Sequence, residues 1–217
     1  MSVVNVFTGQ PKPGRHEEVL EMGRAARRVL EHHGAKDQRL MVATLSTAAY
    51  GSVISSAEFD DLEAWGAFSD AVWADDEILG MISELRGENS PYLTQSLAVS
   101  TEIPLGRPRG PRGPVVWAYV TTPLPGGFEG AVMLAGTAFE VLERHGARNC
   151  RLWQQQPSGV QPELLVSTFE FDNMRSLGKT LNSFQADPAG LAVIGRLQSS
   201  DSPNRPLTSE VYMEVGD

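Results

Sequence analysis

The chain contains the same segment twice, and this repeat constrains its fold more than any other feature of the sequence. Residues 29–40 read VLEHHGAKDQRL, and residues 141–152 read VLERHGARNCRL. The 112 positions between Gly34 and Gly146 relate the two halves without a gap. A repeat of this period indicates two structural units of about a hundred residues each. The 217 residues of the chain hold both copies and a short connection.

The connection is the segment 104–114, which reads PLGRPRGPRGP. It is built from Pro, Gly and Arg without apolar periodicity, and such a composition favours an extended linker. We therefore predict a first repeat over residues 1–103, a linker over 104–114 and a second repeat over 115–217.

Each repeat begins with a strand followed by a helix. Residues 3–8 are β-branched and aromatic, which predicts a strand. After QPKPG, apolar or small residues recur at helical spacing up to His33. Gly34 and Gly146 then follow as expected left-handed residues at the helix ends.

The rest of each repeat predicts a strand pair, a helical region and a final strand. In the first copy the strands cover 38–45 and 52–56, with a turn around 47–51. In the second copy the corresponding turn is 157–162. Asp60 and Asp172 are predicted as the N-caps of the next helix. Residues 76–85 and 94–103 complete the first copy as a short helix and a strand, and residues 207–215 form the last strand of the second.

The order βαββαβ predicts an α+β fold made of two tandem ferredoxin-like repeats. Such a unit has a four-stranded antiparallel sheet with helices on one face only. Two copies can cover their bare faces by pairing them, and this pairing predicts an intramolecular α+β barrel, a pseudo-dimer within one chain.

Composition excludes several classes of function. The formal net charge of −9 argues against a nucleic-acid partner, which requires clustered Lys and Arg. No run of about 18 apolar residues predicts a membrane span. Cys150 is the single cysteine, so the chain has no internal disulfide, and a reducing cytoplasm is the expected compartment. No phosphate-binding, dinucleotide-binding or zinc motif is present, so nucleotide, flavin and metal cofactors are not predicted.

The helix start at Lys12, Pro13 and Gly14, the HGA helix end and the strand ending EFD together resemble the dimeric α+β barrel superfamily. Within it, the chain is most similar to tandem members of the antibiotic-biosynthesis-monooxygenase and NIPSNAP-like groups. The resemblance covers nearly the whole chain, but it lies in caps and turns. It implies the fold, and a range of activities that includes cofactor-free monooxygenases, isomerases, cyclases and heme enzymes.

His33 and His145 end the apolar stripe of the first helix in each copy. Either could act as a general base or bind heme. The alternative is a structural histidine that interacts with the helix dipole and caps free carbonyl groups. The superfamily's heme-degrading members carry an Asn on the first strand, a Trp on the second helix and a His about ten residues later. Asn5 and Trp65 match this set, but approximately Asp75 stands where the His is expected.

Asn5 and Phe7 share one face of the first strand, and Trp117 and Tyr119 hold the same positions in the second copy. By resemblance, this face looks into a cavity between sheet and helices. Asn5 and His33 are therefore the predicted catalytic residues. The remaining predicted ligand-contacting residues are aromatic or imidazole side chains: Phe7, Tyr50, Trp65, Trp117, Tyr119 and His145. All of them could instead be ordinary core or packing residues.

Two arginines and two glutamates occupy equivalent positions in the two copies. Arg39 and Arg151 begin the second strand of each copy and could bind a carboxylate or enolate oxygen, although a salt bridge is the more ordinary role. Glu58 and Glu170 precede the predicted N-caps, so they are expected to be charges at a helix start.

The sequence therefore predicts a cofactor-independent enzyme of the monooxygenase, cyclase or isomerase type, acting on a small apolar or aromatic molecule. One alternative is a non-catalytic ligand-binding or structural pseudo-dimer, and a second is a heme-binding protein. Because bulky Trp117 replaces Asn5 in the second copy, we expect the main ligand cavity in the first.

Overall fold

The computed structural model describes residues 1–46, 50–156 and 164–216. The predicted turns around 47–51 and over 157–162 lie wholly or mostly outside the described residues. By its internal contacts the chain divides into two units. The first unit contains Met1–Thr44, Ala48–Thr101 and Glu214–Asp217, and the second contains Leu45–Thr47 and Glu102–Met213.

The two units repeat the same order of elements. The first has β1 (Val3–Pro11), α1 (His16–His32), β2 (Lys36–Leu45), β3 (Val53–Phe59), α2 (Leu62–Trp73), α3 (Asp76–Arg86) and β4 (Tyr92–Ile103). The second has β5 (Val115–Pro123), α4 (Phe128–Arg144), β6 (Arg148–Gln155), β7 (Leu165–Phe171), α5 (Met174–Ala186), α6 (Pro188–Gln198) and β8 (Asn204–Glu214). Each repeat is thus βαββαβ with its second helical region divided into two helices.

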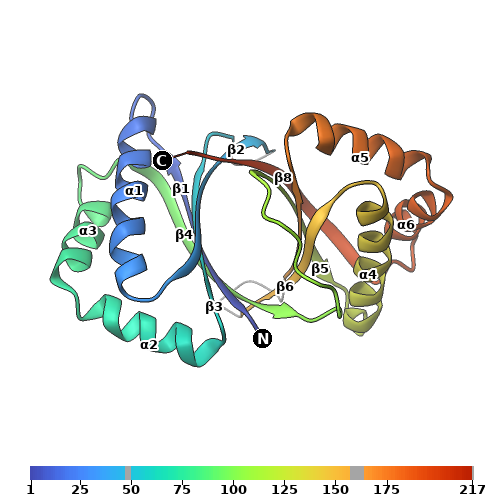
Figure 1. The fold of residues 1–217 in the computed structure, drawn as a ribbon, viewed down its shortest axis with the longest axis horizontal. Coiled ribbons are helices and arrows are strands. Elements are labelled where there is room, and N and C mark those ends of the chain that lie inside the picture. The colour runs from blue at the N-terminus through green and yellow to red at the C-terminus, as the bar shows by residue number, and fades with distance from the viewer. Residues whose placement is uncertain (47–49, 157–163, 217) are drawn as a thin grey trace. The chain divides into compact units, whose positions relative to one another are not determined.

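In both units the strands form an antiparallel sheet in the same order. The first sheet runs β4-β1-β3-β2 and the second runs β8-β5-β7-β6. Figure 1 shows α1, α2 and α3 on one face of the first sheet, and α4, α5 and α6 on one face of the second. The predicted α+β class with two tandem ferredoxin-like repeats is confirmed.

The predicted ends of the first helices are also confirmed. Gly34 has a φ of +90° and Gly146 a φ of +108°, so both occupy the left-handed region that glycine favours. The amide of Ala35 donates to the carbonyl of Leu30 at 3.1 Å, and the amide of Ala147 donates to that of Leu142 at 2.9 Å. These bonds satisfy carbonyl groups that would otherwise be free at the helix ends.

The predicted N-caps are wrong by one residue. Asp61, and not Asp60, caps α2 by accepting a hydrogen bond from the amide of Ala64 at 2.8 Å. In the second unit the cap of α5 is Asn173, and not Asp172. The preceding strand continues through the phenylalanine before each Asp, so the helix starts one position later.

The two displaced carboxylates have another role, which is the same in both repeats. Asp60 pairs with Lys36 at 2.5 Å, and Asp172 pairs with Arg148. Both ion pairs join the residue before the α2 or α5 cap to the first residue of β2 or β6.

Glu58 and Glu170 also differ from their prediction, because both lie within strands. Glu170 on β7 is buried, and its carboxylate accepts hydrogen bonds from the amide of Gly113 and the side chain of Asn149, each at 2.6 Å. Asn149 has a φ of +46°, and the β6–β7 register shifts between Arg148 and Arg151. The carboxylate therefore satisfies groups at an irregular strand and does not begin a helix.

The segment 104–114 packs on the second unit. Arg107 pairs with Glu140 at 3.3 Å and with Glu143, and it donates to the carbonyl of Gly136 at 3.1 Å. All three partners lie on α4. A Cβ added to Gly113 would lie 2.6 Å from the carbonyl oxygen of Phe171, so only glycine permits this close approach.

The cores of the two units differ in continuity. The second unit has one hydrophobic cluster, which extends through its sheet and all three of its helices. The first has two separate clusters. One cluster contains Val3, Ala57 and Phe68, and the other contains Val19 and Leu40.

Candidate ligand site

The side chains of Val3, Asn5 and Phe7 lie on the helix-facing side of β1. Val3 packs in a cluster with Phe68 of α2, and Phe7 packs against a cluster with Val19 of α1. Because side chains alternate along a strand, Asn5 points to the same side as its neighbours two positions away. The prediction that Asn5 and Phe7 share one face is confirmed.

Asn5 carries a polar atom whose hydrogen-bonding capacity is unused. Its Oδ1 is buried and has no hydrogen-bond partner among the described residues. Its cross-strand neighbours are Ala57 on β3 and Val99 on β4, which offer no polar side chain. A buried amide oxygen without a partner is costly, since it has lost water and gained nothing in exchange.

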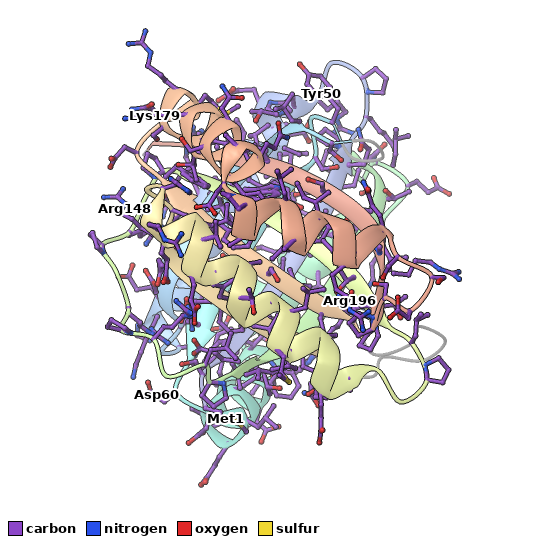
Figure 2. The ribbon with its side chains drawn as sticks, turned by 90° about the vertical axis from the view of Figure 1, so that its right-hand side faces the viewer. Met1, Tyr50, Asp60, Arg148, Lys179 and Arg196 are labelled. Carbon is purple, nitrogen blue, oxygen red and sulfur yellow. The ribbon has the colours of Figure 1, made fainter. Side chains whose placement is uncertain are left out.

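The same position of the second unit is filled by aromatic rings. The rings of Trp117 and Phe169 have centroids 4.8 Å apart, and Phe169 meets Phe139 of α4 at 5.1 Å, edge to face. The indole Nε1 of Trp117 donates to the hydroxyl of Ser209 at 2.8 Å. Figure 2 faces this unit and shows α4, α5 and α6 over the sheet.

Each of these aromatic residues is replaced in the first unit. Asn5 stands for Trp117, Ala57 for Phe169 and Arg27 for Phe139. Trp65 replaces Leu177 and restores part of the lost volume on the α2 side. The first unit therefore lacks three rings at the point where its hydrophobic core is divided.

The position of Ser209 is held by Leu97, and this residue is unusually exposed. Leu97 pairs across strands with Phe7, so both side chains lie on the helix-facing side. Its side chain is 58% exposed. In the second unit the indole of Trp117 reaches over this position. We name Asn5, Phe7, Ala57, Leu97 and Val99 the Asn5 surface. It is apolar apart from one buried amide.

The predicted histidines form a contact that is repeated in both units. His33 Nε2 lies 2.7 Å from Oδ2 of Asp75, and His145 Nε2 lies 2.9 Å from Oδ2 of Asp187. Both histidines are the C-cap residues of the first helix. Each Asp is the N-cap of the last helix of its unit, α3 or α6. We name these contacts the His–Asp clasps.

Each clasp lowers the pKa of its carboxyl group. A hydrogen bond from His33, aided by backbone amides at the start of α3, lowers the pKa of Asp75 below its ordinary value. A hydrogen bond from His145 lowers the pKa of Asp187 in the same way. Arg144 also pairs with Asp187, at 3.0 Å. Because the clasp also occurs in the unit with a filled core, it serves the fold wherever it occurs.

Three other predicted residues are not part of the Asn5 surface. Tyr50 follows the first gap in the described chain, and its side chain is 74% exposed. Trp117 and Tyr119 belong to the second unit, where both pack against its core. Burial raises the pKa of the Tyr119 hydroxyl.

Arg151 makes the salt bridge that was the ordinary expectation for it. Its guanidinium donates to both oxygens of Glu102, at 3.0 and 2.9 Å, and stacks over the ring of Trp153 at 4.0 Å. These partners use the planar face and the edge of the group. Glu102 is the residue of β4 at which the second unit begins by its internal contacts, so both partners of Arg151 belong to that unit.

The clasps leave one ring nitrogen of each histidine for a further ligand. In both of them the imidazole Nε2 is hydrogen-bonded to a carboxylate, so iron could be bound only through Nδ1. Asp75, which stands approximately where the resemblance implies a heme-ligating histidine, is instead the N-cap of α3. No cluster of three or more His, Cys, Asp or Glu side chains suited to a metal ion occurs in the described residues.

Sequence reasoning missed two members of the site. Leu97 lies on the last strand of the first repeat and belongs to no motif. The sequence presents Asp75 only as the residue that stands approximately where the heme-degrading pattern expects a histidine. Alignment of the two repeats would have found both. It places Leu97 against Ser209 and gives each histidine an Asp 42 positions later.

Solved structures resemble the chain over nearly its full length. An anthrone oxidase-like protein superposes with a TM-score of 0.65 and 15% identity, covering 99% of this chain and 91% of that one. A chlorite dismutase from Candidatus Nitrospira defluvii gives a TM-score of 0.56 and 11% identity, with 99% and 91% covered. Neither a protein-family model nor a curated protein matches the chain. At these identities the likeness establishes the fold alone, and this is the fold that the resemblance to the dimeric α+β barrel superfamily implied.

Among the described residues, no helix is both long and apolar enough to cross a membrane.

Proposed function

We propose that the chain is a cofactor-independent enzyme that acts on a small apolar or aromatic molecule held at the Asn5 surface of the first unit. One observation carries this proposal. Asn5 has a buried amide oxygen without a partner among the described residues, at the position where the second unit has an indole. A ligand with one polar group on a flat apolar body would supply both the missing contacts and the missing hydrogen bond.

The amide suits a substrate that passes between a ketone and an enol. Oδ1 can accept a hydrogen bond from an enol or phenol hydroxyl. With its amide group turned over, Asn5 instead donates Nδ2–H to a carbonyl or enolate oxygen. A donor that is held in place in a water-poor environment stabilises an enolate more than water does. Isomerisation and cyclisation through such an enolate need no further reactant.

Oxygenation requires dioxygen as the second substrate. A ring methylene next to a carbonyl loses a proton to form the enolate, and the enolate gives its electrons to dioxygen. The overall change converts CH₂ and O₂ into C=O and H₂O, so atoms and electrons balance without a cofactor. The fold shared with an anthrone oxidase-like protein makes anthrone a suitable first probe.

His33 as the proton-moving residue stays a prediction. Its Nε2 is bonded to Asp75, which leaves only Nδ1 for a substrate. The presence of the same clasp in the second unit supports a structural role for His33, which is the role that a non-catalytic, ligand-binding or structural protein would give it. The cytoplasm remains the compartment that we propose, with Cys150 as a buried free thiol.

The test compares Asn5→Leu with Trp117→Leu. Anthrone is titrated into each folded variant while tryptophan fluorescence is followed, and dioxygen uptake is then measured at saturating anthrone. We expect Asn5→Leu to lose uptake and to weaken binding by about tenfold, which corresponds to one hydrogen bond in a buried site. Trp117→Leu should bind as the unchanged protein does.

Two outcomes would contradict the proposal. Loss of binding only in Trp117→Leu would place the site in the second unit. Binding that depends on Asn5 without any dioxygen uptake or isomerised product would support the non-catalytic alternative for this probe.

A further inference from the structure

The outer face of α1 differs from that of α4 in a way that points to a docking surface. In the second unit, Arg107 of the segment 104–114 contacts three positions one turn apart on α4: Gly136, Glu140 and Glu143. An extended basic segment thus docks on an acidic helix face. The contact is specific, since the Arg107 side chain is only 18% exposed.

The same positions of α1 are Arg24, Arg28 and Glu31. Arg28 of the first unit occupies the position of Glu140, so the charge there is reversed. Arg24 occupies the position of Gly136 and adds a positive charge. Arg28 is exposed and makes no ion pair within the described part of the chain. Arg24 pairs with Glu17 at 3.4 Å through one terminal nitrogen, and its buried Nε has no hydrogen-bond acceptor in the same described residues.

An open groove of about 400 Å³ adjoins Arg28. Its α1 wall carries Arg28 and His32, and its α3 wall carries Asp75 and Glu77. Asp75 is already held by His33. In the second unit, Arg144 occupies the position of His32. Its ion pair with Asp187 joins α4 to the start of α6. On the α1 wall of this groove Arg28 has no ion-pair partner in the described residues, and Arg24 lies one turn before it on α1.

We propose that Arg24 and Arg28 form a docking surface for an extended acidic segment of a partner protein. This segment would lie on α1 as the segment 104–114 lies on α4, with the charges exchanged. Two guanidinium groups one turn apart can each receive a carboxylate through paired N–H donors. Glu31 and Glu77 flank the surface, so the carboxylates of the partner are expected toward Arg24 and away from those two residues.

The probe is a fluorescein-labelled peptide in which every arginine of the segment 104–114 is replaced by glutamate, PLGEPEGPEGP. The basic peptide PLGRPRGPRGP is the control. At low ionic strength we expect the fluorescence anisotropy of the acidic peptide alone to rise on addition of the full-length protein. Added salt should weaken this binding, because the contacts are exposed ion pairs.

Arg28→Glu tests the location of the binding, and Arg196→Glu on α6 is its charge-matched control. Arg196 is exposed and pairs with Asp201 at 2.5 Å. We expect Arg28→Glu to weaken binding of the acidic peptide by at least about fivefold, and Arg196→Glu to leave it within about twofold. Absence of binding to the unchanged protein, or equal effects of the two variants, would overturn the proposal.

Discussion

The two repeats share their elements, strand order, helix ends and His–Asp clasps, yet they differ in what fills the space between sheet and helices. The second repeat builds one continuous core around Trp117, Phe139 and Phe169. The first has Asn5, Arg27 and Ala57 at these positions, and its core is divided. The helix ends and clasps that both repeats share are therefore the features that the fold requires. The position at which the first repeat lacks the rings of the second is where we look for a function.

The largest expected effect is the loss of a ring from the filled core. Phe139→Ala should lower the free energy of unfolding by about 3–5 kcal/mol, because it removes a fully buried side chain and leaves a cavity. Arg27→Ala, at the equivalent position, should cost far less. Urea denaturation of both variants measures this difference, and equal losses would show that the two positions are packed alike.

A smaller effect is expected at the shared helix end. Gly34→Val should cost about 1–2 kcal/mol, because a β-branched residue disfavours a φ of +90°. No heavy atom lies within 4 Å of the position of an added Cβ, so the cost comes from the backbone alone.

Gly80→Ala within α3 also meets open space and should stabilise the protein by up to about 1 kcal/mol. Thermal denaturation of both variants checks this, and a neutral Gly34→Val would argue against the cap.

The His–Asp clasps allow the two repeats to be compared directly. His33→Gln and His145→Gln each remove one hydrogen bond to a carboxylate and should lower the melting temperature by about 2–4 °C. If His33 also moves a proton, only His33→Gln reduces turnover. Identical effects of the two variants on turnover would leave both histidines as structural residues.

The smallest expected effect is a loss, at low pH, of the stability that the Asp75 carboxylate contributes. Because the folded pKa of Asp75 lies below its ordinary value of 3.8, its contribution to stability is complete at higher pH. This contribution is lost as the pH falls through the folded pKa. The difference in stability between the unchanged protein and Asp75→Asn should shrink as the pH falls below 3.8. A difference that grows toward low pH would contradict this sign.

Much of the fold could be predicted from the sequence, since the repeat, the glycine helix ends and the apolar periodicity are local signals. The errors arose where neighbouring residues offered equivalent chemistry. Asp60 and Asp61 are both good caps, and only the length of β3 decides between them. Glu58 was misplaced for a different reason, because the strand predicted over 52–56 continues to Phe59.

The site was predictable only in part. Asn5 and Phe7 were found because a strand alternates its faces. Their importance depends on residues far away in the sequence, such as Ala57 and Leu97, that face them across strands. The partner of His33 was hidden for a similar reason, because Asp75 lies 42 residues away at the start of another helix.

The most direct test of the account exchanges the two sites without requiring a ligand. Asn5→Trp with Leu97→Ser gives the first repeat the indole and hydroxyl of the second, and Trp117→Asn with Ser209→Leu makes the reverse change. Urea denaturation then gives the free energy of unfolding of both variants. We expect the first exchange to be neutral or stabilising, because it gives the first repeat the ring that the second repeat has at this position, and the second exchange to cost about 3 kcal/mol. A loss of about 1–3 kcal/mol from the first exchange, as in an overpacked core, would contradict the claim that the Asn5 surface is open.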